Sequence, residues 1–482
     1  MNIRMVCRAM GSTLVCMGGL SALPLLVAAI YREDMLPFIA MMLLFFSIGG
    51  ILLLFKPKVN AFFAKESFFI VSIVWIIVSL IGCLPFIISG YIPNFLDAFF
   101  ETVSGFTTTG ATILKDIEIL PKGILFWRSF THWIGGMGVL VFVMAVLPIS
   151  KESSLFLARA EMPGPVISKL VPKMHNTAII LYVTYFVLSV ILFLLLLLGG
   201  MPVFDSLIHT FGTAGTGGFS MMNMSVGAYN SAYFEWVIAI FMLLFGINFN
   251  MYFLILLRDI KSVFKNEELR VFFIIIATAT LLITVSLAGT GESIGTAIRN
   301  AFFQVTSIIS TTGYSTANYD LWPTFAKYVL FMLFFCGACA GSTGGGMKIS
   351  RCVLCAKHIK AYITRSIYPR TVVLPRLNGK IVEPELLANT TLFVIVYVII
   401  MIICGLLISL DGFDMMTSLS ASLTAISNVG PGFGGVGPIE NFSDLSNLSK
   451  IILSAEMLLG RLEIFPMLAC LSPLMYKRRR LK

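Results

Sequence analysis

The sequence predicts an all-α polytopic membrane protein, and three observations support this fold class. First, 58% of the 482 residues are hydrophobic and only 12% are charged, whereas soluble domains carry about 25% charged residues. Second, apolar stretches of about 20 residues, the length that crosses a bilayer, recur along the whole chain. Third, four shorter segments with a common plan lie between these stretches. We therefore expect four repeats of span, half-helix and span around a pseudo-fourfold axis, plus two extra N-terminal transmembrane helices.

Ten apolar windows are long enough to be full spans. They cover residues 9–30, 36–55, 68–90, 124–148, 177–199, 233–257, 271–289, 326–347, 390–410 and 450–475. An even number of spans leaves both termini on one side of the membrane. The Lys and Arg residues behind the net charge of +10 gather at both termini and at alternate ends of the spans. Because basic residues concentrate in cytoplasmic loops, we expect both termini to be cytoplasmic, and we expect no nucleic-acid partner.

The repeats divide the chain into five expected units. These are 1–66 for the two N-terminal transmembrane helices, 67–175 for repeat 1, 176–270 for repeat 2, 271–387 for repeat 3 with an intramembrane loop at 337–348, and 388–482 for repeat 4. Each repeat contains one of the four short segments, which cover residues 95–112, 203–220, 297–316 and 413–432.

Each short segment combines an amphipathic half-helix with a polar stretch that ends in glycine. A short polar side chain stands near each predicted helix start, where it can cap free N–H groups. These residues are Asp97, Asp205, Asn300 and Asp414, and the glycines are Gly110, Gly218, Gly313 and Gly430. The glycine follows the expected cap by 13 residues in the first three segments, but by 16 in the fourth. We therefore expect the fourth segment to have a longer helix or a different cap.

The polar stretches suit a cation that has lost its water. A ring of backbone carbonyl oxygens can replace the hydration shell, and glycine permits the dihedral angles that aim successive carbonyls at one axis. The sequences Thr-Thr-Thr-Gly, Gly-Thr-Gly-Gly, Ser-Thr-Thr-Gly and Ser-Asn-Val-Gly have this character. The negative end of each half-helix dipole would also favour a cation. The alternative is that these segments are ordinary polar loops. It can explain one such segment, but it explains poorly four segments at repeat spacing. We interpret the repeats as span–pore-helix–span units around a pore.

A second glycine-rich run, Gly337–Lys348, interrupts the predicted second span of repeat 3. It differs from a phosphate-binding loop because Met347, rather than lysine, follows Gly346, and because an apolar run precedes it. Small residues at 340–346 cannot hold a rigid helix against lipid. The sequence therefore predicts a flexible intramembrane loop that gates the pore, and the alternative is a kink for close helix packing. The candidate gating residues are Gly341, Ser342, Thr343, Gly344, Gly345, Gly346 and Lys348.

Arg461 is a charged residue inside the last predicted span. Such residues are costly in a membrane and usually functional, so we expect Arg461 to face the pore and to act in gating or cation occupancy. The alternative is neutralisation by Glu456 or Glu463, although neither has the usual helical spacing. Two further polar residues, Arg128 and His132, are interpreted as packing anchors near the membrane face.

No catalytic constellation emerges, so the chain is not expected to be an enzyme. The four histidines, His132, His175, His209 and His358, lack metal-ligand spacing. The nine cysteines are odd in number and lie mostly in apolar runs, which argues against a disulfide framework. Two Cys-x-x-Cys pairs imitate zinc spacing, Cys336/Cys339 and Cys352/Cys355, but buried thiols explain them better. A membrane enzyme or lipid-handling protein would need a nucleophile or metal constellation that the sequence does not show.

Several motifs together resemble bacterial TrkH/TrkG-type potassium uptake proteins, in the superfamily that includes KtrB. The resemblance covers almost the whole chain, and the two extra N-terminal spans resemble the TrkH branch. The motifs are residues 97–101, Thr107–Thr112, Trp133–Gly138, Arg159–Pro165, Gly217–Ser220, Ala338–Gly346, Gly430–Gly432 and Gly460–Glu463.

The resemblance implies a potassium-binding filter, with K⁺ as the transported ion and no bound organic cofactor on this chain. Its expected residues are Thr108, Thr109, Gly110, Thr216, Gly217, Gly218, Thr311, Thr312, Gly313, Asn428, Val429 and Gly430. In the family the glycine-rich loop gates, and the arginine that matches Arg461 lies below the filter. The third filter here has Gly-Tyr and the fourth has Asn-Val-Gly, which are modest variations.

The resemblance also implies an assembly and a location. The expected assembly is a homodimer in which each protomer has its own pore, bound to a cytoplasmic nucleotide-binding regulatory ring of the TrkA type. The expected location is the bacterial inner membrane, with multiple spans. Potassium uptake is the expected function. The alternative is a less selective, or a sodium- or proton-coupled, monovalent cation transporter on the same scaffold.

Overall fold

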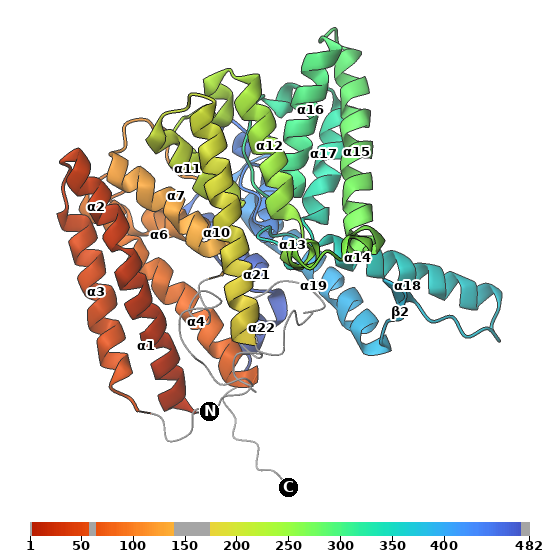
Figure 1. Cartoon of the computed structure of the whole chain (residues 1–482), viewed down its shortest axis with the longest axis horizontal. Helices are drawn as coiled ribbons and strands as arrows, with labels where there is room; N and C mark the ends of the chain where they lie inside the picture. Colours follow the sequence, from red (N-terminus) through yellow and green to blue (C-terminus); the bar gives the residue numbers. More distant parts are fainter. Residues whose placement is uncertain (1, 57–63, 139–173, 474–482) are drawn as a thin grey trace.

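The computed structural model describes residues 2–56, 64–138 and 174–473, which are almost entirely helical (Figure 1). The described part contains a single sheet, an antiparallel hairpin of β1 (Arg376–Leu377) and β2 (Lys380–Ile381). Six stretches in the described part are helical, long and apolar enough to cross a membrane. They are Ile3–Tyr31, Leu36–Leu53, Lys65–Ile88, Ala178–Leu198, Glu267–Ala288 and Pro384–Asp411.

The first three helices, α1 (Ile3–Leu20), α2 (Ala22–Tyr31) and α3 (Leu36–Leu53), form one side of the molecule (Figure 1). Helices α1 and α3 approach each other closely at two glycines. A Cβ atom added to Gly11 would lie 2.9 Å from the carbonyl oxygen of Gly49, and one added to Gly49 would lie 2.9 Å from Val15 Cγ2. Small residues allow such close approach between membrane helices, where van der Waals packing drives association.

The remaining helices repeat one order four times: a long helix, a half-helix and a shorter second helix. The long helices are α4 (Ala64–Gly82) with its continuation α5 (Leu84–Ile88), α10 (Met174–Leu198), α15 (Glu267–Ala288) and α19 (Pro384–Ile408). The half-helices are α6 (Phe95–Phe106), α11 (Val203–Ala214), α16 (Ile294–Ile309) and α20 (Met415–Ser427). The second helices are α7 (Lys122–Gly136), α12 (Ala232–Gly246), α17 (Thr324–Cys336) and α21 (Asn447–Arg461).

Shorter elements connect or follow these helices. They are η1 (Ser225–Tyr229), α13 (Phe249–Leu256), α14 (Ile260–Lys265), η2 (Tyr319–Leu321), α18 (Ile349–Ile367), η3 (Ser409–Asp411), η4 (Gly434–Val436) and α22 (Ile464–Leu471). The η elements are short 3₁₀ helices, which are common as connectors.

The second helices are broken, so the prediction of ten continuous spans is wrong at 233–257, 326–347 and 450–475. Helices α12 and α13 meet at 89°, and Asn248 caps α13 by accepting a hydrogen bond from the Asn250 N–H at 2.9 Å. Helix α17 ends before Gly337, whose φ is +66°. Helix α21 ends at Arg461, and Glu463 with φ +63° precedes α22. The predicted span 124–148 lies partly outside the described residues.

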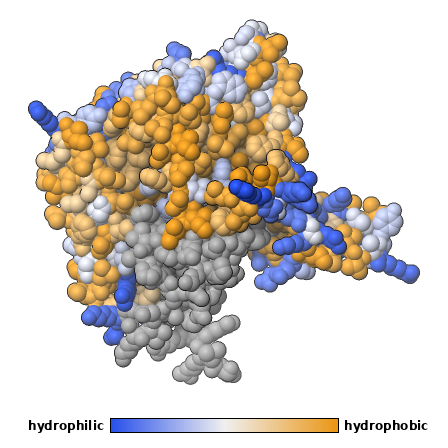
Figure 2. All heavy atoms as spheres, in the orientation of Figure 1, coloured by the Kyte–Doolittle hydropathy of each residue, from blue (hydrophilic) through white to orange (hydrophobic). Residues whose placement is uncertain are grey.

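The four half-helices are short and largely buried, whereas the outer surface is apolar. Figure 2 shows hydrophobic residues over most of the visible face, with hydrophilic residues gathered around α18 and the hairpin. Helix α18 extends away from the helical body (Figure 1). The hairpin after it is tied to the start of α15, because the N–H groups of Glu267 and Asn378 each donate to the other residue's side chain, at 2.8 and 3.0 Å. The break after α17 therefore redirects the chain out of the apolar body.

The close contact of α1 and α3 predicts that a larger side chain lowers thermal stability at the contact but not elsewhere on α1. We expect Gly11→Ile to lower the thermal stability of the purified protein, because overpacking costs about 1–3 kcal/mol. Gly19→Ile on the same helix is the control, since a Cβ atom there meets nothing within 4 Å. Melting of both variants in detergent, followed by fluorescence, measures the difference. Equal melting temperatures would contradict the close packing.

Candidate functional site

The four half-helices begin with different caps from those predicted, except in the last. Only Asp414 acts as expected: its side chain accepts from the N–H groups of Met416 and Thr417. The other three N-caps are Asn94, Pro202 and Ser293. Asp97 and Asp205 instead lie within the first turns of α6 and α11, where a negative charge is favoured by the helix dipole. Asn300 lies inside α16.

With the observed caps, the third segment is the one that differs in length, whereas the sequence predicted that the fourth would differ. The filter glycine follows the observed cap by 16 residues in three of them, from Asn94 to Gly110, from Pro202 to Gly218 and from Asp414 to Gly430. In the third segment, Gly313 follows Ser293 by 20 residues, and α16 has 16 residues against 12 or 13 in the other half-helices. The fourth segment is therefore regular, and the third is longer by about one helical turn.

All four half-helices end in the same backbone turn. The residue two positions before the glycine has a left-handed conformation, with φ between +53° and +60°, and the glycine itself has φ between +77° and +101°. The paired residues are Thr108 and Gly110, Thr216 and Gly218, Thr311 and Gly313, and Asn428 and Gly430. A positive φ is uncommon for threonine because it is β-branched, so the surrounding structure must hold these turns in place. We call the three-residue turns 108–110, 216–218, 311–313 and 428–430 filter loops 1 to 4, after the role that the sequence predicts for them.

The four filter loops contact one another in a closed cycle. A Cβ atom added to any of the four glycines would lie less than 3.0 Å from a carbonyl oxygen of the next loop. The contacts are Gly110 with Gly217, Gly218 with Thr312, Gly313 with Val429, and Gly430 with Thr109. The four glycines also line one depression on the surface. The structure thus brings the twelve residues predicted for the filter into one ring, in the order loop 1, 2, 3, 4 and back to 1.

Hydrogen bonds from several kinds of side chain connect the segments that carry neighbouring filter loops. Between loops 1 and 2, His132 Nδ1 lies 2.7 Å from the Gly105 carbonyl oxygen, and its Nε2 lies 3.3 Å from the Phe219 nitrogen. Between loops 2 and 3, the Tyr314 hydroxyl donates to the carbonyl oxygen of Phe219 at 3.2 Å. His132 therefore anchors packing, as expected, but its partners are the filter segments.

Loops 3 and 4 are joined by Tyr319, whose hydroxyl donates to the carbonyl oxygen of Gly432 at 2.9 Å. Between loops 4 and 1, Asn428 Nδ2 donates to Thr109 Oγ1 at 2.9 Å. Each junction of the ring is therefore held by its own hydrogen bond.

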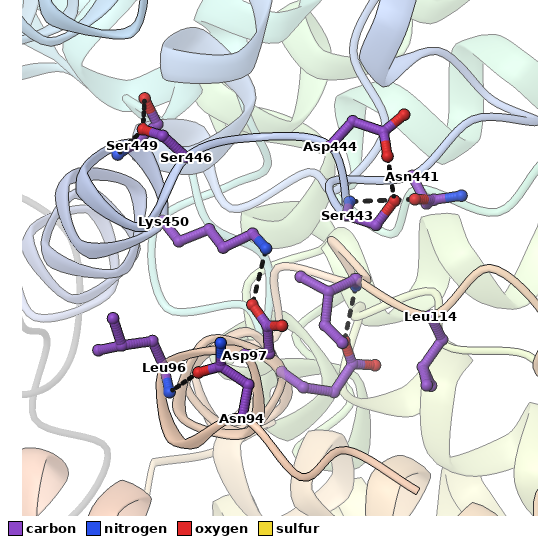
Figure 3. A network of polar contacts seen from close by, with 12 residues as sticks. Asn94, Leu96, Asp97, Leu114, Asn441, Ser443, Asp444, Ser446, Ser449 and Lys450 are labelled. Atoms are coloured by element: carbon purple, nitrogen blue, oxygen red, sulfur yellow. Dashed lines mark hydrogen bonds and ion pairs between the residues drawn. The ribbon is translucent and has the colours of Figure 1, made fainter. Parts of the chain in front are cut away.

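A buried ion pair joins α21, the second helix of repeat 4, to α6, the half-helix of repeat 1. Figure 3 shows Lys450 extending from the first turn of α21 to Asp97 on α6, near the capping residue Asn94. Lys450 Nζ lies 2.7 Å from Asp97 Oδ1, and both side chains are mostly buried. Sequence analysis missed this pair because 353 residues separate its members.

The glycine-rich segment Gly337–Lys348 lies against filter loops 3 and 4. A Cβ atom on Gly344 would lie 2.8 Å from the carbonyl oxygen of Ser310, and one on Gly345 would lie 2.6 Å from that of Ser427. The N–H group of Gly345 donates to Thr311 Oγ1 at 2.6 Å. Only glycine fits at these two positions without displacing the filter.

Other hydrogen bonds fix the same segment to its surroundings. The N–H of Cys339 donates to the carbonyl oxygen of Gly246 at 3.0 Å, and the N–H of Ala340 donates to Glu268 Oε1 at 2.7 Å. Lys348 is fully buried with φ +75°, and its ammonium donates to the carbonyl oxygen of Gly344. The segment is therefore a packed, hydrogen-bonded loop in this conformation. Since α18 leaves in a new direction, a kink within one continuous helix is the wrong description.

Arg461 joins this loop to the first repeat. Its guanidinium donates to the carbonyl oxygen of Thr343 at 2.7 Å, and to those of Gly135 and Gly136 at 2.5 and 2.6 Å. The side chain is buried, so carbonyl oxygens replace the water that would otherwise hydrate the charge.

The two glutamates considered as partners of Arg461 have other contacts. Glu456 Oε1 accepts a hydrogen bond from the Ser422 hydroxyl at 2.6 Å. Glu463 forms an ion pair with Arg351.

The comparisons with known proteins agree closely. The TrkH family model, which is described as a cation transport protein, matches residues 36–476. The chain is 36% identical over 485 residues to the Trk system potassium uptake protein TrkH of Salmonella typhimurium, covering 99% of this chain and 100% of that protein. It is 34% identical over 480 residues to the Trk system potassium uptake protein TrkG of Escherichia coli strain K12, covering 98% of each.

A solved structure is also similar. The crystal structure of the potassium transporter TrkH from Vibrio parahaemolyticus matches with a TM-score of 0.87 and 30% sequence identity, covering 99% of this chain and 100% of that one. This confirms the expectation of an all-helical, multi-span membrane protein. One motif used in the sequence analysis, Arg159–Pro165, lies in residues 139–173, which are outside the described part of the chain.

The Lys450–Asp97 pair predicts a measurable loss of stability. We expect Asp97→Asn to destabilise the protein by about 2 kcal/mol, because it leaves a buried ammonium without its counter-charge. Lys115→Gln is the control, since the Lys115–Asp444 pair is 71% and 74% exposed and such pairs contribute little. Denaturant unfolding in detergent compares the two variants. If Asp97→Asn is no less stable than Lys115→Gln, the pair does not stabilise the contact between α6 and α21.

Proposed function

Because the chain belongs to the TrkH family of cation transport proteins, we propose that it carries potassium ions into a bacterial cell through the ring of four filter loops. Members of this family transport cations and are not enzymes. The observation that carries the proposal is the closed cycle of contacts between the loops, from Gly110 to Gly217 and onward to Thr109. A closed ring of backbone is the arrangement that a dehydrated cation needs, because its water must be replaced from all sides.

The ions would bind to backbone carbonyl oxygens of the four loops. In loop 1 these belong to Thr108, Thr109 and Gly110, and the matching residues of loops 2 to 4 complete the filter. The C-terminal ends of α6, α11, α16 and α20 lead directly into the loops, so the negative ends of four helix dipoles would add to the attraction. The four repeats would then surround a pseudo-fourfold axis, with α4, α10, α15 and α19 opening repeats 1 to 4.

A second function on the same scaffold is less selective monovalent cation transport, or coupling to sodium or protons. One difference among the loops favours this second function. The residue with left-handed backbone is threonine in loops 1 to 3 but asparagine in loop 4, where Asn428 donates a hydrogen bond to Thr109. Bi-ionic currents with sodium opposing potassium separate the two functions, because a selective filter gives a strongly shifted reversal potential.

We propose that the segment Gly337–Lys348 is the gate. Its residues Gly341, Ser342, Thr343, Gly344, Gly345, Gly346 and Lys348 lie against loops 3 and 4, and Arg461 bonds to the segment at Thr343. A loop of small residues in this position blocks the path in one conformation and clears it in another. Control would come from a cytoplasmic, nucleotide-binding ring of the TrkA type, acting on a homodimer in the inner membrane with cytoplasmic termini.

The filter proposal predicts that added side chains will stop transport. We expect Gly110→Ala to abolish rubidium uptake into liposomes, because its Cβ atom would overlap the carbonyl oxygen of Gly217. Gly90→Ala is the matched control: its φ of +77° is similarly strained for alanine, but nothing lies within 4 Å of the added atom. Unchanged uptake by the Gly110 variant would refute the proposed filter, and lost uptake by both would indicate backbone strain alone.

The gate proposal predicts that Arg461→Gln raises rubidium flux, in contrast to Gly110→Ala, which should abolish it. Loss of the guanidinium removes its bonds to Thr343 and to the first repeat, so we expect higher basal rubidium flux in the absence of the cytoplasmic partner. Shortening the loop at 341–346 should act in the same direction and weaken control by the partner. Arg270→Gln, at an exposed arginine, is the control. Basal flux and control that both match the unmodified protein would reduce the loop to a packing element.

A further inference from the structure

We propose that Glu101 and Arg128 form an electrostatic clamp at the outer mouth of the filter: Arg128 joins loops 1 and 2, and Glu101 cancels its positive charge beside the ion path. Glu101 is a positioning residue in this view, because it acts on ions through Arg128. The proposal rests on the proposed function, since it concerns how readily a cation enters the same ring.

The pair is completely buried inside the protein. Arg128 Nε lies 2.6 Å from Glu101 Oε1, and the side chains are 1% and 0% exposed. Glu101 is on α6, the half-helix of repeat 1, and Arg128 is on α7. Apolar residues of similar volume are often as stable as a buried ion pair, so packing alone does not require these two charges.

Glu101 holds the chain that follows filter loop 1. Its Oε1 also accepts from the Thr112 hydroxyl at 3.0 Å, and its Oε2 accepts from the Ile113 N–H at 3.0 Å. Both residues come directly after Gly110 and Ala111. The carboxylate thus fixes the outer end of loop 1 while it binds the guanidinium.

Arg128 reaches the corresponding place in repeat 2. Its NH1 group donates to the carbonyl oxygen of Ser220 at 2.9 Å, and its guanidinium carbon lies 3.5 Å from the centre of the Phe219 ring. Both residues follow Gly218. Arg128 also lines the depression that the four filter glycines share, so its charge lies beside the entrance that a cation would use.

A comparison of the four repeats shows which feature is specific to repeat 1. The position nine residues before the filter glycine is Glu101 in repeat 1, His209 in repeat 2, Gln304 in repeat 3 and Ala421 in repeat 4. His209 Nε2 lies 3.3 Å from Ser220 Oγ, and Gln304 Nε2 lies 3.5 Å from Thr316 Oγ1. Repeats 2 and 3 therefore contact the chain after their filter through an imidazole and a neutral amide. In repeat 1 the extra feature is the carboxylate, which is matched to Arg128.

The size of the effect follows from Coulomb's law. At about 10 Å and an effective dielectric constant of about 20, one uncompensated charge changes the occupancy of a monovalent cation roughly tenfold. Removal of the Glu101 charge should therefore weaken entry of potassium by about that factor. Removal of both charges should restore it.

The test compares three variants in liposomes by rubidium uptake at increasing rubidium concentration. Glu101→Gln places in repeat 1 the side chain that repeat 3 already carries. We expect it to raise the half-saturating concentration about tenfold with little change in maximal rate, and we expect Glu101→Gln with Arg128→Gln to return it toward the unmodified value. Asp444→Asn is the control: it removes one carboxylate from the exposed Lys115–Asp444 pair, and water screens that change.

Three outcomes would overturn the proposal. The first is an unchanged half-saturating concentration in Glu101→Gln. The second is a double variant as impaired as the single one while both melt like the unmodified protein, because the clamp would then act by structure alone. The third is an equal effect of Asp444→Asn. Failure of the proposed function is distinguishable, since the unmodified protein would then show no filter-dependent uptake, as judged with Gly110→Ala.

Discussion

The close contact between neighbouring filter loops is the constraint on which the rest of the structure depends. Irregular backbone inside an apolar protein is tolerated only where protein or trapped water satisfies its polar groups. Here each loop lies against the next, and the cycle closes from Gly430 back to Thr109. The half-helices bring the loops to this place, and the second helices supply the residues behind them. A change in one loop must therefore be absorbed by its two neighbours.

The closed ring also explains the breaks in the second helices. Helix α12 ends at Gly246, whose carbonyl oxygen binds Cys339, and α17 ends where the glycine-rich segment begins. Helix α21 ends at Arg461, which bonds to Gly135 and Gly136 at the end of α7. The ends of the four second helices thus meet beneath the ring and enclose the segment that we propose as the gate.

Sequence patterns predicted the long first helix of each repeat, the half-helices and the filter glycines, because hydropathy and glycine content are local properties. They were wrong about the second spans of repeats 2 to 4, which are broken. Helix caps were predicted poorly: Asn94 lies three residues before the expected Asp97, and Ser293 lies seven residues before the expected Asn300. Several polar residues near each helix start compete for the role. The pair of Lys450 and Asp97 could not be predicted, since it joins distant parts of the chain. Glu101 had a usable signal, because a carboxylate stands nine residues before the filter glycine in repeat 1, where the other repeats have histidine, glutamine and alanine.

The separation of Lys450 from Asp97 has a consequence for biosynthesis. Asp97 is synthesised early and its partner Lys450 follows 353 residues later, so this ion pair can form only after the start of α21 has been synthesised. A chain that stops between Gly430 and α21 contains all four filter loops but lacks Lys450, so Asp97 stays without its counter-charge.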